Sequence, residues 1–169
     1  MIERGPSSAD PQPPGERWGQ AQHVLTVATR GAGFTDLTAE LRHWLRSIGA
    51  HDGVATAFVR HTSASLVIQE NADPDVQRDL ASALGRLAPE TAPYRHTIEG
   101  RDDMPAHIKA MLTGTSFSIP VSRGSPVLGT WQALYLVEHR TAPHRRDVVL
   151  HFMGTCAAPS GSHAAPEPP

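Results

Sequence analysis

Apolar positions recur at helical spacing in three segments of the chain. In the first, residues 35–48, the apolar side chains on one helix face are Leu37, Leu41, Trp44, Leu45 and Ile48. The second, residues 74–88, begins with Asp73 as a capping residue and Pro74 in the first turn. The third covers residues 103–113, and its apolar face consists of Met104, Ile108, Met111 and Leu112. The pattern therefore predicts three helices.

Short runs rich in β-branched and aromatic residues predict strands between these helices. The runs cover residues 22–29, 53–61, 65–69, 116–121, 127–129, 131–139 and 147–153. Residues 122–126 (SRGSP) have the composition of a hairpin turn, and the last strands follow one another closely, which favours antiparallel pairing. Helices and strands do not alternate regularly. We therefore expect an α+β protein, a single compact domain with a mostly antiparallel β-sheet and about three helices.

The two ends of the chain have a different composition. Residues 1–16 and 157–169 are rich in proline, serine, glycine and alanine, with few large apolar side chains to bury. Such segments are expected to be disordered and dispensable for folding. The sequence thus predicts one domain over residues 17–156, which suits a chain of 169 residues.

Charge, hydropathy and cysteine usage exclude several classes of protein. A net charge of -2 and a pI near 6.5 argue against a nucleic-acid-binding protein. No apolar run approaches the roughly 20 residues of a membrane span, and the N-terminal residues do not resemble a secretory signal. The single cysteine, Cys156, excludes an intramolecular disulfide and a thiolate metal cage. These features predict a cytoplasmic protein without membrane or nucleic-acid partners.

Polar residues concentrate first at two predicted strand ends. Residues 61–65 (HTSAS) lie where one strand ends and the next begins, a place where rigid scaffolds present reactive side chains. These hydroxyl groups could equally serve only the backbone of a turn. In residues 69–75 (QENADPD), Glu70, Asn71 and Asp75 could contact a cation or a phosphate-bound metal. A solvated helix start explains the same residues as well.

Two further polar segments follow. Residues 94–107 contain His96, His107 and several carboxylates, which suit a divalent ion, although their spacing matches no standard zinc motif. In residues 129–140, alternation along the strand puts Trp131, Ala133, Tyr135, Val137 and His139 on one face. The sequence Glu138-His139-Arg140 then brings charge to the rim of a core. The chain has neither a P-loop nor a G-x-S-x-G elbow.

Three long strings in these regions resemble the YjbQ-like family, whose members are described as having secondary thiamine-phosphate synthase activity. They are HTSASLVIQENADPDVQRDL, YRHTIEGRDDMPAHIKAMLTGTS and IPVSRGSPVLGTWQALYLVEHR, and the likeness extends over about residues 20–155. The resemblance implies a compact α+β homotrimer. It also implies a transferase that joins a pyrimidine-methyl diphosphate to thiazole phosphate and releases diphosphate. The chain departs from the family at Thr97, where some members have aspartate.

The resemblance also implies a shared polar site in which His61, His96, His107 and His139 converge. Within it we expect His96, His107 and His139 to bind a divalent metal ion, zinc or magnesium, because three imidazoles leave an open coordination position. Acid–base or electrostatic roles are then expected for His61, Glu138 and Arg140. Contacts to a phosphorylated small-molecule substrate are expected from Ser63, Asn71, Lys109, Trp131 and Gln132. The alternative is a non-catalytic trimeric protein that binds a metal or metabolite.

Overall fold

The structure is a computed structural model that describes residues 16–157. Its elements follow in the order β1 (Glu16–Ala28), β2 (Gly33–Asp36), α1 (Thr38–Ser47), β3 (Ala50–Val59), β4 (Ala64–Glu70), α2 (Pro74–Leu87), α3 (Asp103–Leu112), β5 (Ser116–Ser122), β6 (Ser125–Pro126), β7 (Gln132–Glu138) and β8 (Arg145–Ala157). The described residues begin one residue before the predicted domain of residues 17–156 and end one residue after it. The remainder of both predicted tails lies outside the described residues.

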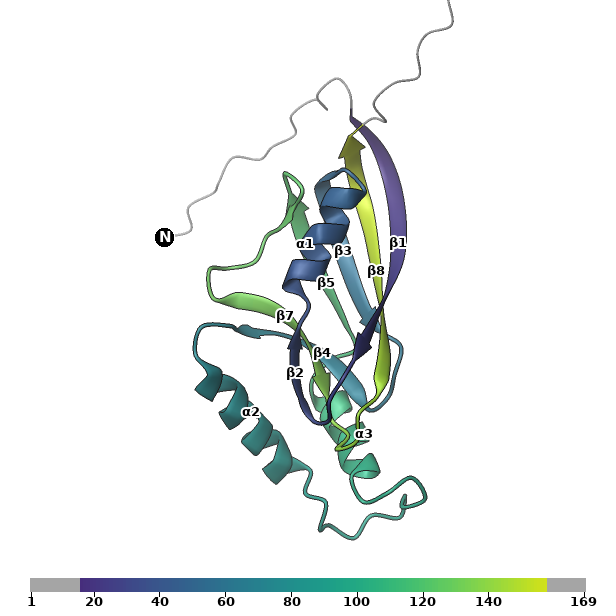
Figure 1. Ribbon diagram of the computed structural model, residues 1–169, viewed down its shortest axis with the longest axis vertical. Coiled ribbons are helices and arrows are strands. Elements are labelled where there is room, and N and C mark those ends of the chain that lie inside the picture. Colours follow the sequence, from purple (N-terminus) through teal and green to yellow (C-terminus); the bar gives the residue numbers. More distant parts are fainter. Residues whose placement is uncertain (1–15, 158–169) are drawn as a thin grey trace, which may run out of the picture.

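The strands form two antiparallel sheets. One has five strands in the order β1-β8-β3-β5-β6, and the other has three in the order β2-β7-β4. The core lies between the inner faces of the sheets and α1, and is built from side chains such as Leu45, Leu66, Ala57, Leu136 and Phe152. In Figure 1, α1 lies over the longer strands, α2 stands beside the smaller sheet and α3 lies near the end of β7. Among the described residues, no helix is long and apolar enough to cross a membrane.

The α+β class, the three helices and the antiparallel pairing are confirmed. The strands occupy two sheets instead of one. Strand β2 was not expected, because it pairs with β7 about a hundred residues away and has no local signal. The expected strand at residues 127–129 was wrong: the chain leaves the sheet after β6. The hairpin turn is confirmed, since Ser122 pairs with Ser125 across Arg123 and Gly124, which both have positive φ.

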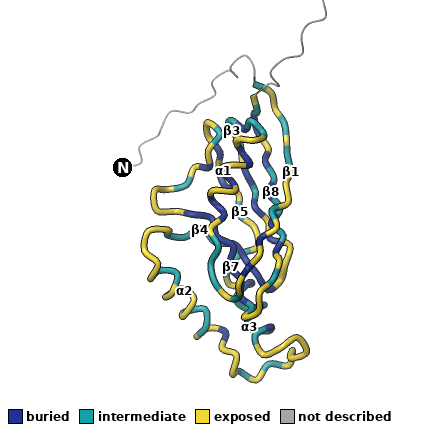
Figure 2. Tube along the Cα trace, in the orientation of Figure 1, coloured by how far each residue is buried: buried dark blue, intermediate teal, exposed yellow. Residues whose placement is uncertain are grey.

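Strand β7 determines where the polar residues lie. Its residues from Ala133 to Glu138 are buried on both faces, as expected for the middle strand of a covered sheet. Successive side chains alternate, so Leu134, Leu136 and Glu138 face the core and β8, whereas Val137 and His139 face α2. Figure 2 shows the contrast between the buried strands and the more exposed α2. The side chains of Glu138 and His139, which are neighbours in the sequence, therefore point to opposite sides of the sheet.

Candidate metal centre

Two histidines and one aspartate form a cluster at the start of α3. The Nε2 atom of His96 lies 2.7 Å from Oδ2 of Asp103, and Nε2 of His107 lies 3.3 Å from the same oxygen. Asp103 and His107 are four residues apart on α3, so they share one helix face, and His96 comes from the preceding loop. The three ligand atoms lie within 4.8 Å of one another. This spacing suits a divalent ion with bonds of about 2.0–2.2 Å, and this donor set fits zinc or another transition metal.

The ring of His107 is oriented by the backbone. Its Nδ1 atom lies 3.0 Å from the carbonyl oxygen of Thr62, which can only accept a hydrogen bond. Nδ1 must therefore carry the proton, and Nε2 is left to face Asp103. A hydrogen bond from the outer nitrogen of a histidine to a carbonyl is the usual support of a metal ligand. The side chains of His96 and His107 are 43% and 32% exposed, so the cluster is open to solvent on one side.

Arg140 holds the carboxylates of this cluster in place. Its guanidinium donates from Nη1 to Asp103 Oδ1, from Nε to Asp102 Oδ2 at 3.1 Å and from Nη2 to the carbonyl of Glu99. Burial acts against ionisation of Asp102, but hydrogen bonds from Thr141 and Arg140 outweigh it and hold the pKa of Asp102 well below its usual value. The hydrogen bond to Asp102 raises the pKa of Arg140. Since all of its nitrogens already donate within the protein, Arg140 acts on the cluster as a positioning residue.

A second polar group is a buried ion pair between β7 and β8. Arg146 donates to both carboxylate oxygens of Glu138 at 2.7 Å, and the two side chains are 2% and 1% exposed. Burial disfavours the Glu138 carboxylate, but hydrogen bonds from Arg146 and Arg140 lower its pKa overall. Thr29 supplies a further hydrogen bond at 3.0 Å. Glu138, an expected catalytic residue, is thus fully engaged in a structural pair.

His139 is not part of the cluster that contains the other two expected metal ligands. Its Nε2 atom is 2.8 Å from Ser65 Oγ, and the residue is 4% exposed. Burial and the nearby charge of Lys109 lower the pKa of His139 to about 4. His139 lines a cavity with Ala81 and Leu84 of α2 and with Lys109 of α3. Asp103 takes the third position in the cluster that His139 was expected to fill.

His61 is connected to the candidate metal centre by the residue that follows it, Thr62. Its Nδ1 atom accepts a hydrogen bond from the backbone N–H of Ser63 at 3.1 Å, and the next residue, Thr62, orients His107. Burial, followed by the charge of Arg146, lowers the pKa of His61. A neutral ring with Nδ1 accepting carries its proton on Nε2. In this geometry the Nε2–H group of His61 can donate a hydrogen bond; the expected acid–base role of His61 stays a prediction. Ser63 is buried against Arg146 instead of lining the open side.

Three expected substrate-binding residues lie elsewhere. Trp131 and Gln132 are at the start of β7 and His139 follows its end, roughly 23 Å along the strand. Asn71 belongs to the same remote end, since its N–H donates to the carbonyl of Trp131. Lys109 is closer to the site and lines a cavity with Glu138 and His139. The structure therefore does not bring Asn71, Trp131 and Gln132 together with the histidines.

Sequence reasoning did not identify Asp103 as a ligand or Arg146 as the partner of Glu138. Asp103 was only one of several carboxylates in residues 94–107 and was not singled out, although Asp-x-x-x-His at the start of a helix puts two ligands on one face. That spacing was the available signal. Arg146 gave none, because its contact with Glu138 depends on how β7 and β8 come together in space.

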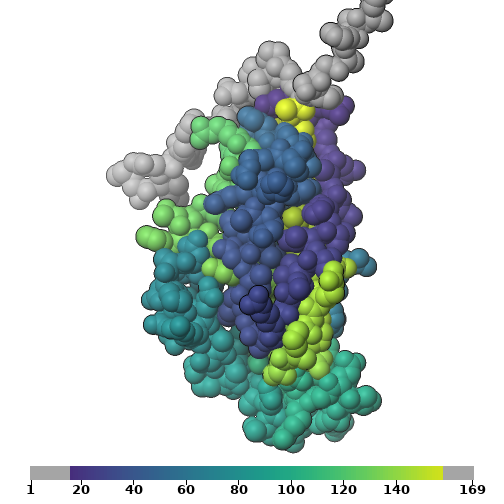
Figure 3. All heavy atoms as spheres, in the orientation of Figure 1, coloured from purple at the N-terminus to yellow at the C-terminus, as the bar shows by residue number. Residues whose placement is uncertain are grey.

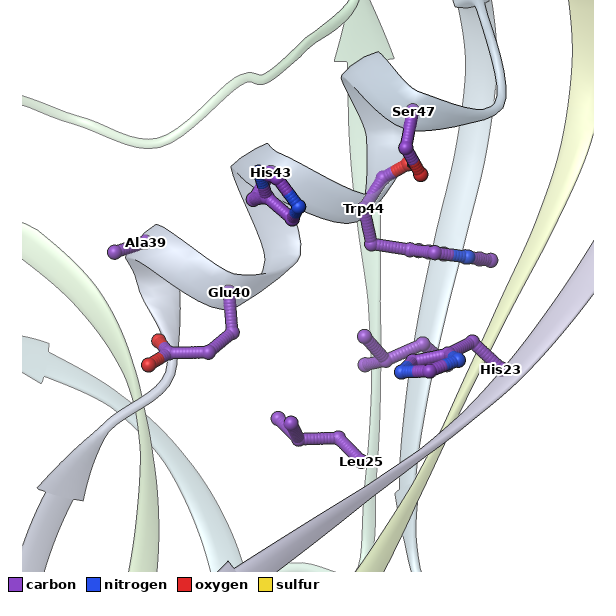
Figure 4. Close-up of a pocket in the computed structure, with 8 residues that line it drawn as sticks. His23, Leu25, Ala39, Glu40, His43, Trp44 and Ser47 are labelled. Atoms are coloured by element: carbon purple, nitrogen blue, oxygen red, sulfur yellow. The ribbon is translucent and has the colours of Figure 1, made fainter.

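A larger cavity lies between α1 and β1, remote from these groups. It has a volume of about 540 Å³ and is lined mainly by apolar atoms, with His23, Trp44 and Leu150 among its walls. The rings of His23 and Trp44 stack with their centroids 6.4 Å apart. Figure 4 shows these rings facing one another, and Figure 3 shows α1 lying against β1 on the surface. No ion pair or metal-ligand cluster of the described residues lies in this cavity.

Comparisons with known proteins give one consistent result. The family described as UPF0047 protein YjbQ-like matches residues 23–155. UPF0047 protein sll1880 of Synechocystis is 49% identical over 136 residues, covering 80% of this chain and 92% of that protein. UPF0047 protein YjbQ of Escherichia coli is 37% identical over 134 residues, covering 79% and 97%.

Solved structures of similar proteins agree with the fold. An uncharacterized conserved protein of the YjbQ/UPF0047 family from Clostridium acetobutylicum has a TM-score of 0.70 at 36% identity and covers 78% of this chain and 98% of its own. The hypothetical protein APE1520 of Aeropyrum pernix has a TM-score of 0.73 at 30% identity and covers 79% and 98%. These names assign no reaction to the relatives.

Proposed function

The chain belongs to the YjbQ-like UPF0047 family, and on that premise we propose that it is a metal-dependent enzyme of small phosphorylated substrates. The observation that carries the proposal is the cluster of His96, Asp103 and His107, open to solvent on one side. A site with three protein donors leaves coordination positions for substrate, which distinguishes a catalytic centre from a closed structural one. Arg140 and the carbonyl of Thr62 supply the supporting contacts that such a centre needs.

The specific reaction that we propose is thiamine-phosphate formation as a secondary activity. In it, the bond between the pyrimidine methylene carbon and diphosphate breaks, and a bond from that carbon to the thiazole nitrogen forms. A divalent ion bound at the cluster would neutralise charge on the departing diphosphate. The Nε2–H group of His61, which has a tautomer fixed by Ser63, would donate a hydrogen bond to a phosphate oxygen beside it. We propose this reaction because of the family resemblance. The reaction needs a cation beside the diphosphate, and the cluster is a candidate site for one.

We further propose that the protein is a homotrimer. The support is the outer face of the five-stranded sheet, where neighbouring strands align uncharged rows. One row contains Gln20, Met153, Val54 and Pro120, and another contains Val24, Val149, Phe58 and Ser116. Val54, Phe58 and Met153 are 42%, 45% and 53% exposed. A row of polar residues that includes Thr56 and Ser118 lies between these two rows. Large apolar side chains exposed on uncharged rows of a sheet are typical of a contact between subunits. Light scattering should give three times the chain mass, and Phe58→Lys should lower that mass.

An activity assay tests the enzymatic proposal. Protein purified without a histidine tag is incubated with aminopyrimidine-methyl diphosphate and thiazole phosphate, and released diphosphate and thiamine phosphate are both quantified. We expect turnover that a chelator abolishes, that added zinc or magnesium restores and that His96→Gln removes. Metal bound without turnover on these substrates or on a broader set of phosphate esters would support the non-catalytic alternative. Turnover unaffected by the chelator and by His96→Gln would overturn the metal-dependent mechanism.

A further inference from the structure

Helix α2 covers the smaller sheet without packing closely against it. The helix is amphipathic, and its apolar residues Val76, Leu80 and Leu84 point toward the sheet. Nevertheless none of its residues is fully buried, and Leu87 is 66% exposed. An amphipathic helix in a filled interface buries its apolar stripe. The space beneath α2 is therefore only partly occupied by protein side chains.

Two adjoining cavities take up this space. The first, about 100 Å³, is lined by Lys109, Glu138 and His139 together with small and apolar residues. The second, about 240 Å³, is lined mainly by apolar side chains, including Val67, Ile68, Leu80 and Phe117. Phe34, Leu84 and Val137 line both, so the polar cavity adjoins the apolar one. Together they reach the lower end of the ~300–1,000 Å³ range of small-molecule sites.

The polar end carries a positive charge without a partner among residues 16–157. Lys109 is the only lysine of the 169-residue sequence, and no carboxylate of the described chain forms an ion pair with it. Glu138 also lines this cavity, but its charge is compensated by the two hydrogen bonds from Arg146 on the other side of the sheet. The net charge presented to the cavity is that of the Lys109 ammonium group.

His139 adds a directed hydrogen-bond donor. Its Nε2 atom is paired with the Ser65 hydroxyl, which has no other hydrogen-bond partner among the described residues. When that hydroxyl donates, the neutral ring carries its proton on Nδ1. Nδ1 has no partner among the described residues and is not sealed from solvent, although the residue is 4% exposed. With that tautomer, the buried side chain has an unpaired N–H group among the described residues.

We propose that the space beneath α2 is a binding site for a small amphipathic anion, a carboxylate or phosphate monoester on an apolar body. The anionic head contacts Lys109 and the Nδ1–H group of His139, and the body lies between α2 and the smaller sheet against Val67 and Phe117. Such a ligand fills the gap under the apolar stripe of α2 and neutralises the lone ammonium group. The site does not depend on the metal centre, and its occupancy is separable from the proposed activity.

Matched ligands test the site in the full-length protein. Isothermal calorimetry is carried out with octanoate, octyl phosphate and neutral octanol, and with acetate and inorganic phosphate as heads without a body. A chelator is present throughout, so that no ligand can bind through a metal ion. The binding result is then independent of whether the proposed metal-dependent activity exists. We expect octanoate or octyl phosphate to bind at least tenfold more tightly than octanol and than either bare head. Whichever of the two binds more tightly identifies the head group.

Variants separate this site from non-specific binding. Lys109→Met should weaken binding of the preferred anion at least tenfold and leave octanol unchanged. Arg46→Met, which removes one positive charge from the exposed side of α1, should leave both unchanged. Circular dichroism and melting temperature check that each variant is folded. Equal binding of octanol and the anions, unchanged binding by Lys109→Met, or no binding of any amphipath to the wild-type chain would each overturn the proposal.

Discussion

The Nδ1 atom of His107 lies 3.0 Å from the carbonyl oxygen of Thr62, and this contact leaves Nε2 facing Asp103. It connects the HTSAS segment to α3, two parts of the chain more than forty residues apart. The backbone of β4's preceding turn thereby fixes a ring that lies on a helix.

The tautomer of His107 is a first prediction. On addition of zinc, the Nε2 resonance of His107 should move to the range of a metal-bound nitrogen, while Nδ1 stays protonated because Thr62 accepts its proton. Nitrogen-15 NMR correlating ring nitrogens with ring protons measures both. His43, on the exposed side of α1, serves as the control and should not respond. Zinc binding at Nδ1 of His107 would contradict the orientation described here.

Arg140 gives a second prediction. Arg140→Lys keeps the charge but cannot reach Asp102, Asp103 and the Glu99 carbonyl at once. We expect zinc affinity to fall about 10–100-fold, as for other lost supports of a ligand. Competition with a chromophoric chelator measures the affinity.

Arg101→Lys is the matched control for Arg140, since Arg101 is exposed and makes no ion pair among the described residues. Its zinc affinity should equal that of the wild type. If Arg140→Lys binds zinc as tightly as the control does, Arg140 does not position the cluster.

The buried ion pair gives a third prediction. Arg146→Met leaves the carboxylate of Glu138 buried without compensation and should lower the free energy of unfolding by about 3–5 kcal/mol. The double variant Glu138→Gln with Arg146→Met removes the charge and keeps one acceptor oxygen for the N–H of Arg140, while the new amide NH2 group can donate to the Thr29 hydroxyl. It should therefore be more stable than Arg146→Met alone, as measured by urea unfolding. A double variant less stable than the single one would show that the two charges are not the source of the loss.

His139 gives a fourth prediction, which concerns pH. Its folded pKa of about 4 lies below the ordinary 6.5, so the unfolded chain binds the proton more tightly. Its contribution to stability is complete above pH 6.5 and is lost as the pH falls toward 4. Relative to His139→Gln, the wild type should lose about 2–3 kcal/mol of unfolding free energy between pH 7 and pH 4.5. Urea unfolding measures the free energy at each pH. If it changes with pH by the same amount in both proteins, the lowered pKa of His139 is refuted.

Local patterns predicted the elements of this fold but not how the sheets divide. The stripe of Leu37, Leu41 and Leu45 and the capping of α2 by Asp73 depend on neighbours in the chain, so α1 and α2 could be placed from the sequence. Strand β2 could not, because four residues acquire their conformation from pairing with β7. The division into two sheets has the same origin in long-range pairing.

The candidate site shows the same division. His96 and His107 were expected together and lie together, because one loop and one helix turn join them. His139 was expected with them but is not part of the cluster. The alternation of β7 was predictable, but which face of that strand meets α3 depends on tertiary packing. Likewise the partners of Arg140 and Arg146 could be found only once the ends of β7, β8 and α3 were placed in space.

The most direct test of the metal centre is the zinc content of untagged protein after equilibrium dialysis. We expect one ion per chain for the wild type. We also expect at least 100-fold weaker binding by His96→Gln and by Asp103→Asn, both checked for folding by circular dichroism, and unchanged binding by His43→Gln. Wild-type protein that retains no more zinc, or any other divalent transition metal, than His96→Gln does would contradict the existence of this metal centre.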